Sequence, residues 1–493
     1  MSMSEYFLLL PIMVPAVGGA SLWLFRMRDT TRNIVTELFV IANAVAAWML
    51  AVCRPQGDLT LLSFSDTLHI TLRLDGMGTF FLLLASTLWI FVSIYAFSYM
   101  KTEEHRHMFF TFFTLSLAAV DGIALAGNII TLYFFYEMLT LATLPLVMHG
   151  CRKVDMHAGR VYAAYQLGGA AFALVGIIYL TSAVGAGDFV LGGYIKTADT
   201  VVMAVWFVML LGFGVKACIF PLYRWLPTAS VAPTPVTALL HAAAVVKAGV
   251  FAVMRLSYYT FDPAILRGSR VGGAGFLLAC FTAVFASILA VREGHFKRRM
   301  AYSTVSNLSY ILVGVLTFTE AGLAAGLCHM IYHAMIKLNA FLTCGAFMKQ
   351  SGKHNVDDLD GMGYRMPVTF ACFTVSAISL CGIPPLNGFV SKWMLLTSVT
   401  EGGNVLSWVG GASLITASLL CAVYMLTCAV RAYFPYRGKD TEGSGTVNAV
   451  NAVKEAPLGM LLPMVIFAAA NVVLGMFSSP ITDIVTAIAG GKF

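Results

Sequence analysis

Charged residues are scarce in this 493-residue sequence: they make up 11% of it, against about 25% in soluble proteins. The 24 acidic and 31 basic residues are too few to cover the surface that soluble domains of this total length would expose. Hydrophobic residues reach 59%. This composition excludes a soluble enzyme and a disordered chain, and it indicates an integral membrane protein with lipids around it.

Motifs for cofactors and nucleotides are also missing. The ten cysteines form no CxxC pair, so neither a zinc site nor an iron–sulfur cluster is indicated. No GxGxxG and no GxxxxGK followed by Ser or Thr occurs, so no nucleotide site is indicated. The net charge of +7 is typical of membrane proteins, which collect Lys and Arg in cytoplasmic loops, and nucleic-acid binding is not expected. We predict no cofactor and no metal ion.

Long apolar runs are the dominant feature of the sequence, and they predict about fourteen transmembrane helices. The runs are continuous rather than alternating, which favours an all-α integral membrane protein over a β-barrel. They lie at about 6–25, 34–53, 77–99, 108–127, 129–149, 161–184, 201–227, 236–258, 272–291, 301–319, 321–347, 367–398, 406–434 and 458–478. The narrowest boundary is Gly127-Asn128, where one continuous helix would reduce the count to thirteen.

The distribution of basic residues predicts the orientation of the chain. With fourteen spans, 19 of the 31 Lys and Arg residues fall in the odd-numbered loops. The positive-inside rule makes that side cytoplasmic. We therefore expect a multi-pass protein of the cell (inner) membrane, with both termini outside and the polar loop 435–457 in the cytoplasm.

Ionisable side chains inside the predicted spans are the first functional signal. A charge at the bilayer centre costs about 2.5–3.5 kcal/mol on insertion scales, so a structural protein has little reason to keep many of them. For any single residue the alternative is an interhelical salt bridge. The residues that stand out are Asp121, Glu137, Lys216, Arg224, His241, Lys247, His329, His333, Lys337 and Lys392.

Two spans contain prolines that predict broken helices. Span seven holds Pro221 and Pro227, and span twelve holds Pro384 and Pro385. Each proline removes a backbone donor and clashes with the preceding turn, and broken backbone at membrane depth is typical of ion sites in transporters. The breaks lie five spans apart, an odd number, so spans 4–8 and 9–13 would form two inverted five-helix repeats. The alternative is two unrelated proline kinks.

The predicted organisation follows from these repeats. Spans 1–3 occupy residues 1–107, the first repeat 108–258, and the second repeat 272–434. A cytoplasmic loop and the last span occupy residues 435–493.

Several motifs together resemble a known family. They are YEMLTL around Glu137, the segment 214–255 with its RWLPTA stretch, KRRMAYSTVSNLSY at 297–310, HMIYHAMIKLNAFL at 329–342 and GIPPLNGFVSKW at 382–393. Over about 110–420, in order and spacing, the sequence resembles the antiporter-like subunits of respiratory complex I, membrane-bound hydrogenases and Mrp-type sodium/proton antiporters. The resemblance implies fourteen helices and proton conduction along a polar axis in the membrane plane.

The resemblance also implies roles for individual residues. It implies that Glu137 pairs with Lys216, that Lys247 is the eighth-span lysine, and that Lys392 ends the relay. His329, His333 and Lys337 match the eleventh-span chain. The sequence departs from the family pattern at Thr228, where an acid is usual, and at Ala232, where glycine often stands. Asp121 matches no family feature.

The chemistry of these residues fits proton transfer. A buried lysine loses solvation and therefore releases its proton more readily, and a nearby carboxylate such as Glu137 opposes that release. His329, His333 and Lys337 stand at i, i+4 and i+8, so they form one helical stripe about 12 Å long. Zinc binding and plain packing are the alternatives for the two histidines.

The other candidates have simpler alternatives. His241 and Lys247 are six residues apart and do not share a helix face, so we expect different contacts for them. A hydrogen-bonded core histidine is the alternative for His241. Arg224 is expected to snorkel to the interface. Asp121 either carries protons or bridges helices.

We predict a proton-translocating, antiporter-like subunit of a larger redox-driven or Mrp-type complex. Its partners would be other membrane subunits, and its substrates protons and, in an Mrp-type complex, sodium. The alternative is a secondary sodium/proton antiporter working alone. A third class, a membrane enzyme acting on lipid or quinone, would need polar groups gathered near one interface. Whether the chain takes part in an enzyme is left open, because it has no redox motif of its own.

The two halves differ in a way that predicts a lateral route. Span ten, the expected counterpart of the span with Glu137, holds no acid; Tyr302 and Tyr310 are its nearest titratable groups. A proton would therefore pass sideways from the first half to Lys392. We expect the intermediate carriers Lys247, His329, His333 and Lys337 to lie in one polar file.

Overall fold

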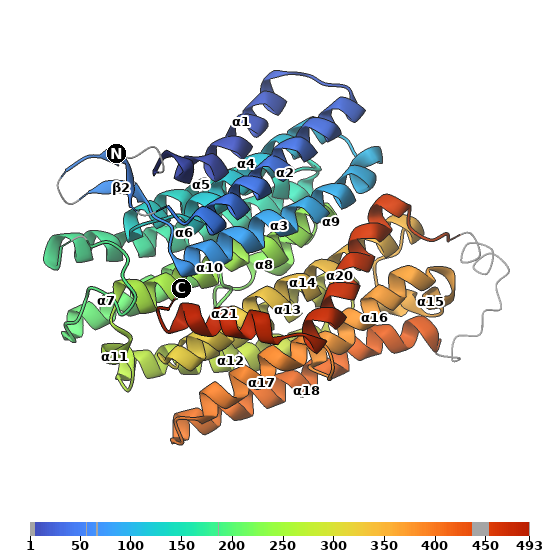
Figure 1. Ribbon diagram of the computed structural model, residues 1–493. Coiled ribbons are helices and arrows are strands. Elements are labelled where there is room, and N and C mark those ends of the chain that lie inside the picture. Colours follow the sequence, from blue (N-terminus) through green and yellow to red (C-terminus); the bar gives the residue numbers. More distant parts are fainter. Residues whose placement is uncertain (1–4, 56, 66–67, 186, 436–452, 493) are drawn as a thin grey trace.

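The computed structural model describes residues 5–55, 57–65, 68–185, 187–435 and 453–492, and these ranges fold almost entirely into helices (Figure 1). Most of the predicted cytoplasmic loop 435–457, and the C-terminal Phe493, lie outside the described residues. The first half contains η1 (Glu5–Leu9), α1 (Leu10–Leu24), α2 (Asp29–Cys53), α3 (Gly76–Tyr99), η2 (Met100–Thr102), α4 (Arg106–Ala124), α5 (Ile129–Val147), α6 (Lys153–Ala183), α7 (Thr200–Gly214), α8 (Trp225–Ala229), α9 (Thr234–Ala238), η3 (Leu239–Ala243), α10 (Val245–Arg255) and η4 (Leu256–Thr260).

The second half continues the helical architecture. It contains α11 (Pro263–Leu266), α12 (Arg270–Arg292), α13 (Phe296–Val315), α14 (Glu320–Ser351), η5 (Val356–Leu359), α15 (Met362–Arg365), α16 (Pro367–Cys381), α17 (Asn387–Thr400), α18 (Val405–Tyr433), α20 (Leu458–Met476) and α21 (Ser479–Ala489). The described strands form one antiparallel hairpin, β1 (Leu59–Ser63) with β2 (His69–Leu72). The sequence did not predict this hairpin between α2 and α3, nor the short apolar helix α21.

The predicted all-α membrane class is confirmed. Among the described residues, ten helical stretches are long and apolar enough to cross a membrane, and α7, α16 and α21 are shorter apolar helices. The helices α13 and α14 are long but carry many buried polar side chains, and they are not among those ten. Each of the fourteen predicted runs contains helix, while the count of fourteen spans stays a prediction.

The boundary at Gly127-Asn128 separates two helices. Helix α4 ends at Ala124, and the side chain of Asn128 accepts a hydrogen bond from the backbone nitrogen of Thr131, at 2.8 Å, at the start of α5. This is an N-cap, which satisfies one of the free N–H groups of a helix start. A single helix through this point is therefore excluded.

Both predicted helix breaks are present. Helix α7 ends at Gly214 and α8 begins at Trp225, with Pro221 between them; α16 ends at Cys381 and α17 begins at Asn387, with Pro384 and Pro385 between them. The interpretation of Pro227 as a break residue is wrong. It lies in the first turn of α8, where proline costs no intrahelical hydrogen bond.

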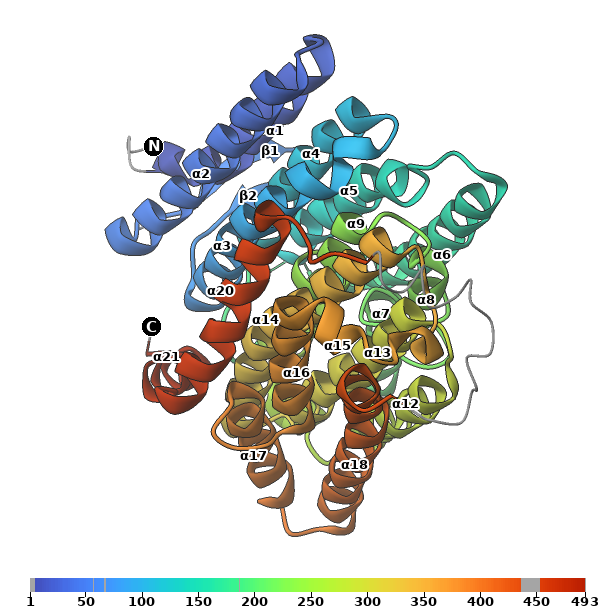
Figure 2. The same ribbon diagram turned by 90° about the vertical axis from the view of Figure 1, so that its right-hand side faces the viewer.

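Span eight is also irregular, which the sequence did not predict. Between α9 and α10 the chain forms the π-helix η3, and a second π-helix, η4, follows α10. Such bulges frequently mark functional sites in helices. The most apolar part of this segment, within Thr234–Thr260, is entirely buried inside the protein. Together with α14, which contacts both α9 and η3, it occupies the centre of the bundle (Figure 2).

Several basic residues that the topology argument counted as loop charges are buried. Lys297 is 2% exposed and Arg255 is 0% exposed. The guanidinium of Arg255 pairs with both carboxylate oxygens of Asp75, the N-cap of α3, and lies over the rings of Phe251 and Tyr259. Arg255 thus joins the end of α10 to the start of α3.

Replacing Arg255 by alanine should destabilise the protein by about 3 kcal/mol, because it removes a fully buried cation and leaves Asp75 without its partner. Thermal unfolding of the detergent-solubilised protein, followed by tryptophan fluorescence, measures this. Arg267→Ala, at an exposed position, is the matched control and should shift stability little. Equal stability of the two variants would contradict the assignment.

Candidate functional site

Lys216 lies at the first helix break, one residue past the C-cap of α7, and is fully buried. Its Nζ donates to Thr140 Oγ1 at 2.6 Å and to Gln166 Oε1 at 3.2 Å. It lies 3.9 Å from Glu137 Oε1 and 3.8 Å from the centre of the Tyr136 ring. The pair expected from the sequence is therefore in contact, and α5 and α6 supply all four of its partners.

Glu137 is placed between the interior and the outer surface of the bundle. Its side chain is 20% exposed, and its neighbours on the outer face of α5, Met138 and Leu141, are 43% and 61% exposed. Its Oε1 has no hydrogen-bond partner among the described residues. Lys216 is thus fully buried, and its acidic partner Glu137 lies at the rim of the bundle.

Lys247 and His333 connect the two halves. Lys247 lies on α10 and His333 on α14, both fully buried, and Lys247 Nζ is 2.5 Å from His333 Nδ1. Backbone packing brings α10 close to the Lys216 break as well: a Cβ on Gly249 would lie 2.4 Å from the backbone nitrogen of Ala217. Only glycine fits there, because backbone cannot give way.

His329 continues the polar file along α14. Its ring lies 5.8 Å from that of His333 and 5.7 Å from that of Tyr310, and its Nδ1 is 2.9 Å from Ser391 Oγ. Ser391 is adjacent in sequence to Lys392. The predicted stripe on α14 therefore exists, and its His329 end faces the second helix break.

Lys392 lies on α17, just after that break, and is only partly buried. Its Nζ donates to Ser418 Oγ at 3.0 Å and lies 5.1 Å from the Tyr310 ring centre. The Tyr310 hydroxyl is 3.1 Å from Ser418 Oγ as well. Tyr310 and Ser418 thus join Lys392 to His329, and a cavity of about 210 Å³ borders this group.

Lys337 contacts helix α13. Its Nζ contacts the carbonyl oxygen of Met300, at 3.1 Å, and the hydroxyl of Ser303, both on α13. It lies two helical turns from His329 along α14. Lys337 is therefore buried, as expected, and its place in the order of the file stays a prediction.

Of the remaining candidates, His241 borders this file, because the Phe341 ring on which it packs also lies 5.8 Å from Lys337 Nζ. His241 Nε2 is 3.3 Å from Ser230 Oγ, and its ring packs on Phe341 at 4.5 Å, so its contacts differ from those of Lys247, as predicted from their spacing. Arg224 is the N-cap of α8 and is exposed. Asp121 is fully buried on α4 beside Asn43 of α2.

The structure adds polar residues that the sequence analysis did not single out. Glu37 in α2 accepts a hydrogen bond from Ser93 at 2.5 Å, and Lys297 donates to the carbonyl oxygen of Ala232 at 2.5 Å. Glu37 lay inside a predicted span and was detectable; Lys297 stood in a basic cluster that looked like a loop. Gln166, which accepts a hydrogen bond from Lys216, gave no signal because neutral polar residues are common in membrane helices.

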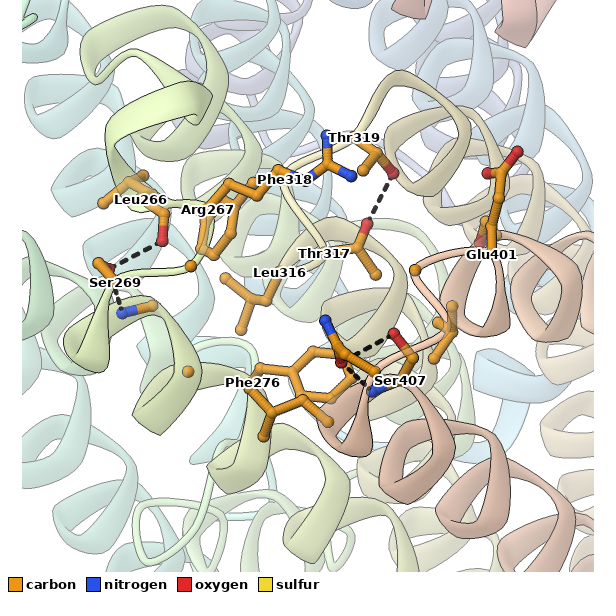
Figure 3. Close-up of a pocket in the computed structure, with 18 residues that line it drawn as sticks. Leu266, Arg267, Ser269, Phe276, Leu316, Thr317, Phe318, Thr319, Glu401 and Ser407 are labelled. Atoms are coloured by element: carbon orange, nitrogen blue, oxygen red, sulfur yellow. Dashed lines mark hydrogen bonds between the residues drawn. The ribbon is translucent and has the colours of Figure 1, made fainter.

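Within the described ranges, no three His, Cys, Asp or Glu side chains gather in a way that could hold a metal ion. A cavity of about 180 Å³ lies at one end of the bundle, lined by Arg267, Phe276, Thr317 and Glu401 among others (Figure 3). None of the relay candidates lines it, so it is not part of this site.

Comparison with known proteins places this arrangement in a family. Residues 126–419, more than half of the chain, match the family described as NADH:quinone oxidoreductase/Mrp antiporter, TM. NADH-quinone oxidoreductase subunit N of Desulforudis audaxviator is 31% identical over 422 residues, which cover 84% of this chain and 83% of the relative. A Na(+)/H(+) antiporter subunit of Alkalihalophilus pseudofirmus is 27% identical over 483 residues, which cover 96% of this chain and 94% of the relative.

Solved structures show the same fold at lower sequence identity. A chain of the Mrp complex from Dietzia sp. DQ12-45-1b superposes with a TM-score of 0.87 at 21% identity, covering 100% of this chain and 98% of that one. A chain of the archaeal membrane-bound sulfane sulfur reductase gives 0.84 at 23% identity, covering 99% and 97%. The matched range contains the Glu137–Lys216 pair, the α14 stripe and Lys392. This chain therefore belongs to the NADH:quinone oxidoreductase/Mrp antiporter family of transmembrane subunits.

Proposed function

We propose that this chain translocates protons across the membrane as an antiporter-like subunit of a larger complex, through a buried Glu/Lys/His relay. The observation that carries the proposal is the 2.5 Å contact between Lys247 of the first half and His333 of the second. Both are bases, both are fully buried, and among the described residues no acid pairs with either. In direct contact, the amine and the imidazole would be able to pass a proton from one to the other.

The Glu137–Lys216 pair would control the uptake of a proton by the first half of the relay. With the carboxylate beside Lys216, as in the structure, the ammonium form is stabilised. With the carboxylate turned away from Lys216, the enclosed lysine would give up its proton. Gly249 brings the backbone of α10 against this break, so the next base is Lys247. Water molecules between the two lysines would complete the transfer, since no hydrogen bond joins their side chains directly.

From His333 the proton would pass along α14 and then to Lys392. The steps use His329, with Ser391, Tyr310 and Ser418 around it, and Lys337 serves as a side branch that exchanges with His333. Moving one charge against 100 mV costs about 2.3 kcal/mol. The relay itself supplies no such energy, so we assign the driving force to other subunits of a redox-driven or Mrp-type complex.

The proposed function also needs an orientation in the membrane. We place the chain in the cell (inner) membrane with both termini outside, and we treat 108–258 and 272–434 as inverted repeats. The presence of one helix break in each range, at α7–α8 and at α16–α17, supports the repeats. A reporter enzyme fused after the C-terminus should be active only outside the cell.

The assembled complex should lose proton translocation when His333 is replaced by glutamine. Glutamine still accepts a hydrogen bond from Lys247 but cannot take up a proton, so the rate should fall at least about a hundredfold, as when an acid–base group is removed. Proton uptake into inverted membrane vesicles, recorded with a pH-sensitive dye, measures the rate. Cys328→Ser, on the same helix, is the control. An unchanged rate in His333→Gln would refute a relay through this residue.

The purified chain in liposomes separates the proposal from a stand-alone sodium/proton antiporter. Without other subunits, a sodium gradient should drive no proton movement above that of empty liposomes. Sodium-dependent exchange by the chain alone, abolished by His333→Gln, would establish the stand-alone antiporter instead.

A further inference from the structure

We propose that Asp121 is a proton-binding site outside the relay: a carboxylic acid that keeps its proton and, with Asn43, clamps α2 to α4. Both residues are 0% exposed, and they lie 78 positions apart in the sequence. Helices α2 and α4 run near each other at the N-terminal edge of the bundle in both views (Figures 1 and 2).

One hydrogen bond joins Asn43 and Asp121, and one oxygen of each side chain is left without a partner among the described residues. Asn43 Nδ2 donates to Asp121 Oδ2 at 2.9 Å. The other oxygen of each side chain, Asp121 Oδ1 and Asn43 Oδ1, is buried and has no hydrogen-bond partner among the described residues. Two acceptors with no donor cannot satisfy each other, and each unsatisfied buried oxygen is costly. One hydrogen placed between them removes both deficits.

A proton on Asp121 Oδ1 is that hydrogen. The hydroxyl then donates to Asn43 Oδ1 while the Asn43 amide donates to Asp121 Oδ2, which closes a ring of two hydrogen bonds between a neutral acid and a neutral amide. An ionised Asp121 would instead hold a full charge in the interior with one neutral donor, an arrangement that proteins rarely tolerate.

In the described part of the chain, no basic side chain near Asp121 would neutralise an ionised carboxylate there. The helices packed on α4 are α1, α2, α3 and α5. Their ionisable side chains, apart from tyrosines and Cys53, are Asp29, Arg32 and Glu37 on α2 and Glu137 on α5. Within the described ranges these make their ion pairs and side-chain hydrogen bonds elsewhere, and Asn43 is the one side chain that acts on Asp121.

A sodium ion is the competing occupant, because it too would satisfy two oxygens. It would need several further oxygen ligands, and only two unsatisfied ones belong to this pair. The geometry therefore favours the proton, which needs no further ligand.

Infrared spectroscopy of the purified protein tests the assignment. The wild type should show the C=O stretch of a protonated carboxylic acid at neutral and at mildly alkaline pH, and Asp121→Asn should lose that band. Asn43→Leu should keep the band but shift it to higher frequency, because the hydrogen bond to the amide is gone. Glu37→Gln is the matched control and should leave the band unchanged, since Glu37 is partly exposed and hydrogen-bonded to Ser93.

Three results would overturn the proposal. The absence of an Asp121-dependent band at neutral pH would mean that the carboxyl group is ionised. Loss of the band on addition of sodium chloride, but not of choline chloride, would make the pair a sodium site. Weakening of the band in liposomes under an imposed pH gradient would show that Asp121 releases its proton during turnover.

Discussion

Proton translocation should fall to the level of empty membranes when Lys216 is replaced by alanine, a loss of at least about a hundredfold. Lys216 is fully buried, and its contacts with Thr140 and Gln166 hold its Nζ beside Glu137. Alanine leaves no group there that can take up a proton. The rate of dye quenching in inverted vesicles that contain the assembled complex measures the effect.

Arginine at the same position distinguishes proton carriage from simple positive charge. Lys216→Arg retains a cation near Glu137, but a guanidinium stays protonated at any accessible pH, so translocation should remain absent. Lys196→Ala, at an exposed position, is the control, and blotting of the membranes checks that each variant assembles. Normal translocation in Lys216→Ala, or in Lys216→Arg, would show that Lys216 is not a carrier.

Replacing Glu137 by glutamine should reduce translocation nearly as much, again about a hundredfold. The amide has the shape of the carboxylate but no charge, so the ammonium form of Lys216 loses the counter-charge that lies 3.9 Å from it. Burial then favours the neutral amine, and the lysine no longer loads a proton from the first half. The same vesicle assay measures the rate.

The control for Glu137→Gln is Glu37→Gln, the matched change in an acid of α2 that contacts Ser93 rather than a lysine. Glu137→Asp, which restores the charge one methylene shorter, should recover part of the rate. If glutamine supports normal turnover, the carboxylate at position 137 does not control Lys216. Loss of activity in Glu37→Gln as well would indicate a general effect of removing membrane acids.

Composition and local spacing determined much of this protein. The shortage of charged residues and the continuous apolar runs indicated a membrane bundle, because only a helix satisfies its own backbone in lipid. Pro221 in span seven and Pro384 and Pro385 in span twelve predicted the breaks at α7–α8 and α16–α17. The i, i+4, i+8 spacing of His329, His333 and Lys337 predicted one stripe, since helical periodicity is a local property.

The tertiary structure decided which buried polar groups meet. Lys247 and His333 are 86 residues apart, and Asn43 and Asp121 are 78 apart; no periodicity in the sequence records such pairs. The structure also decided that Lys337 meets Met300 and Ser303 of α13. It decided too that Arg255 is paired, since packing of α10 against α3 supplies Asp75. Local spacing determines which residues share a face of one helix, and helix packing determines which residues of different helices come into contact.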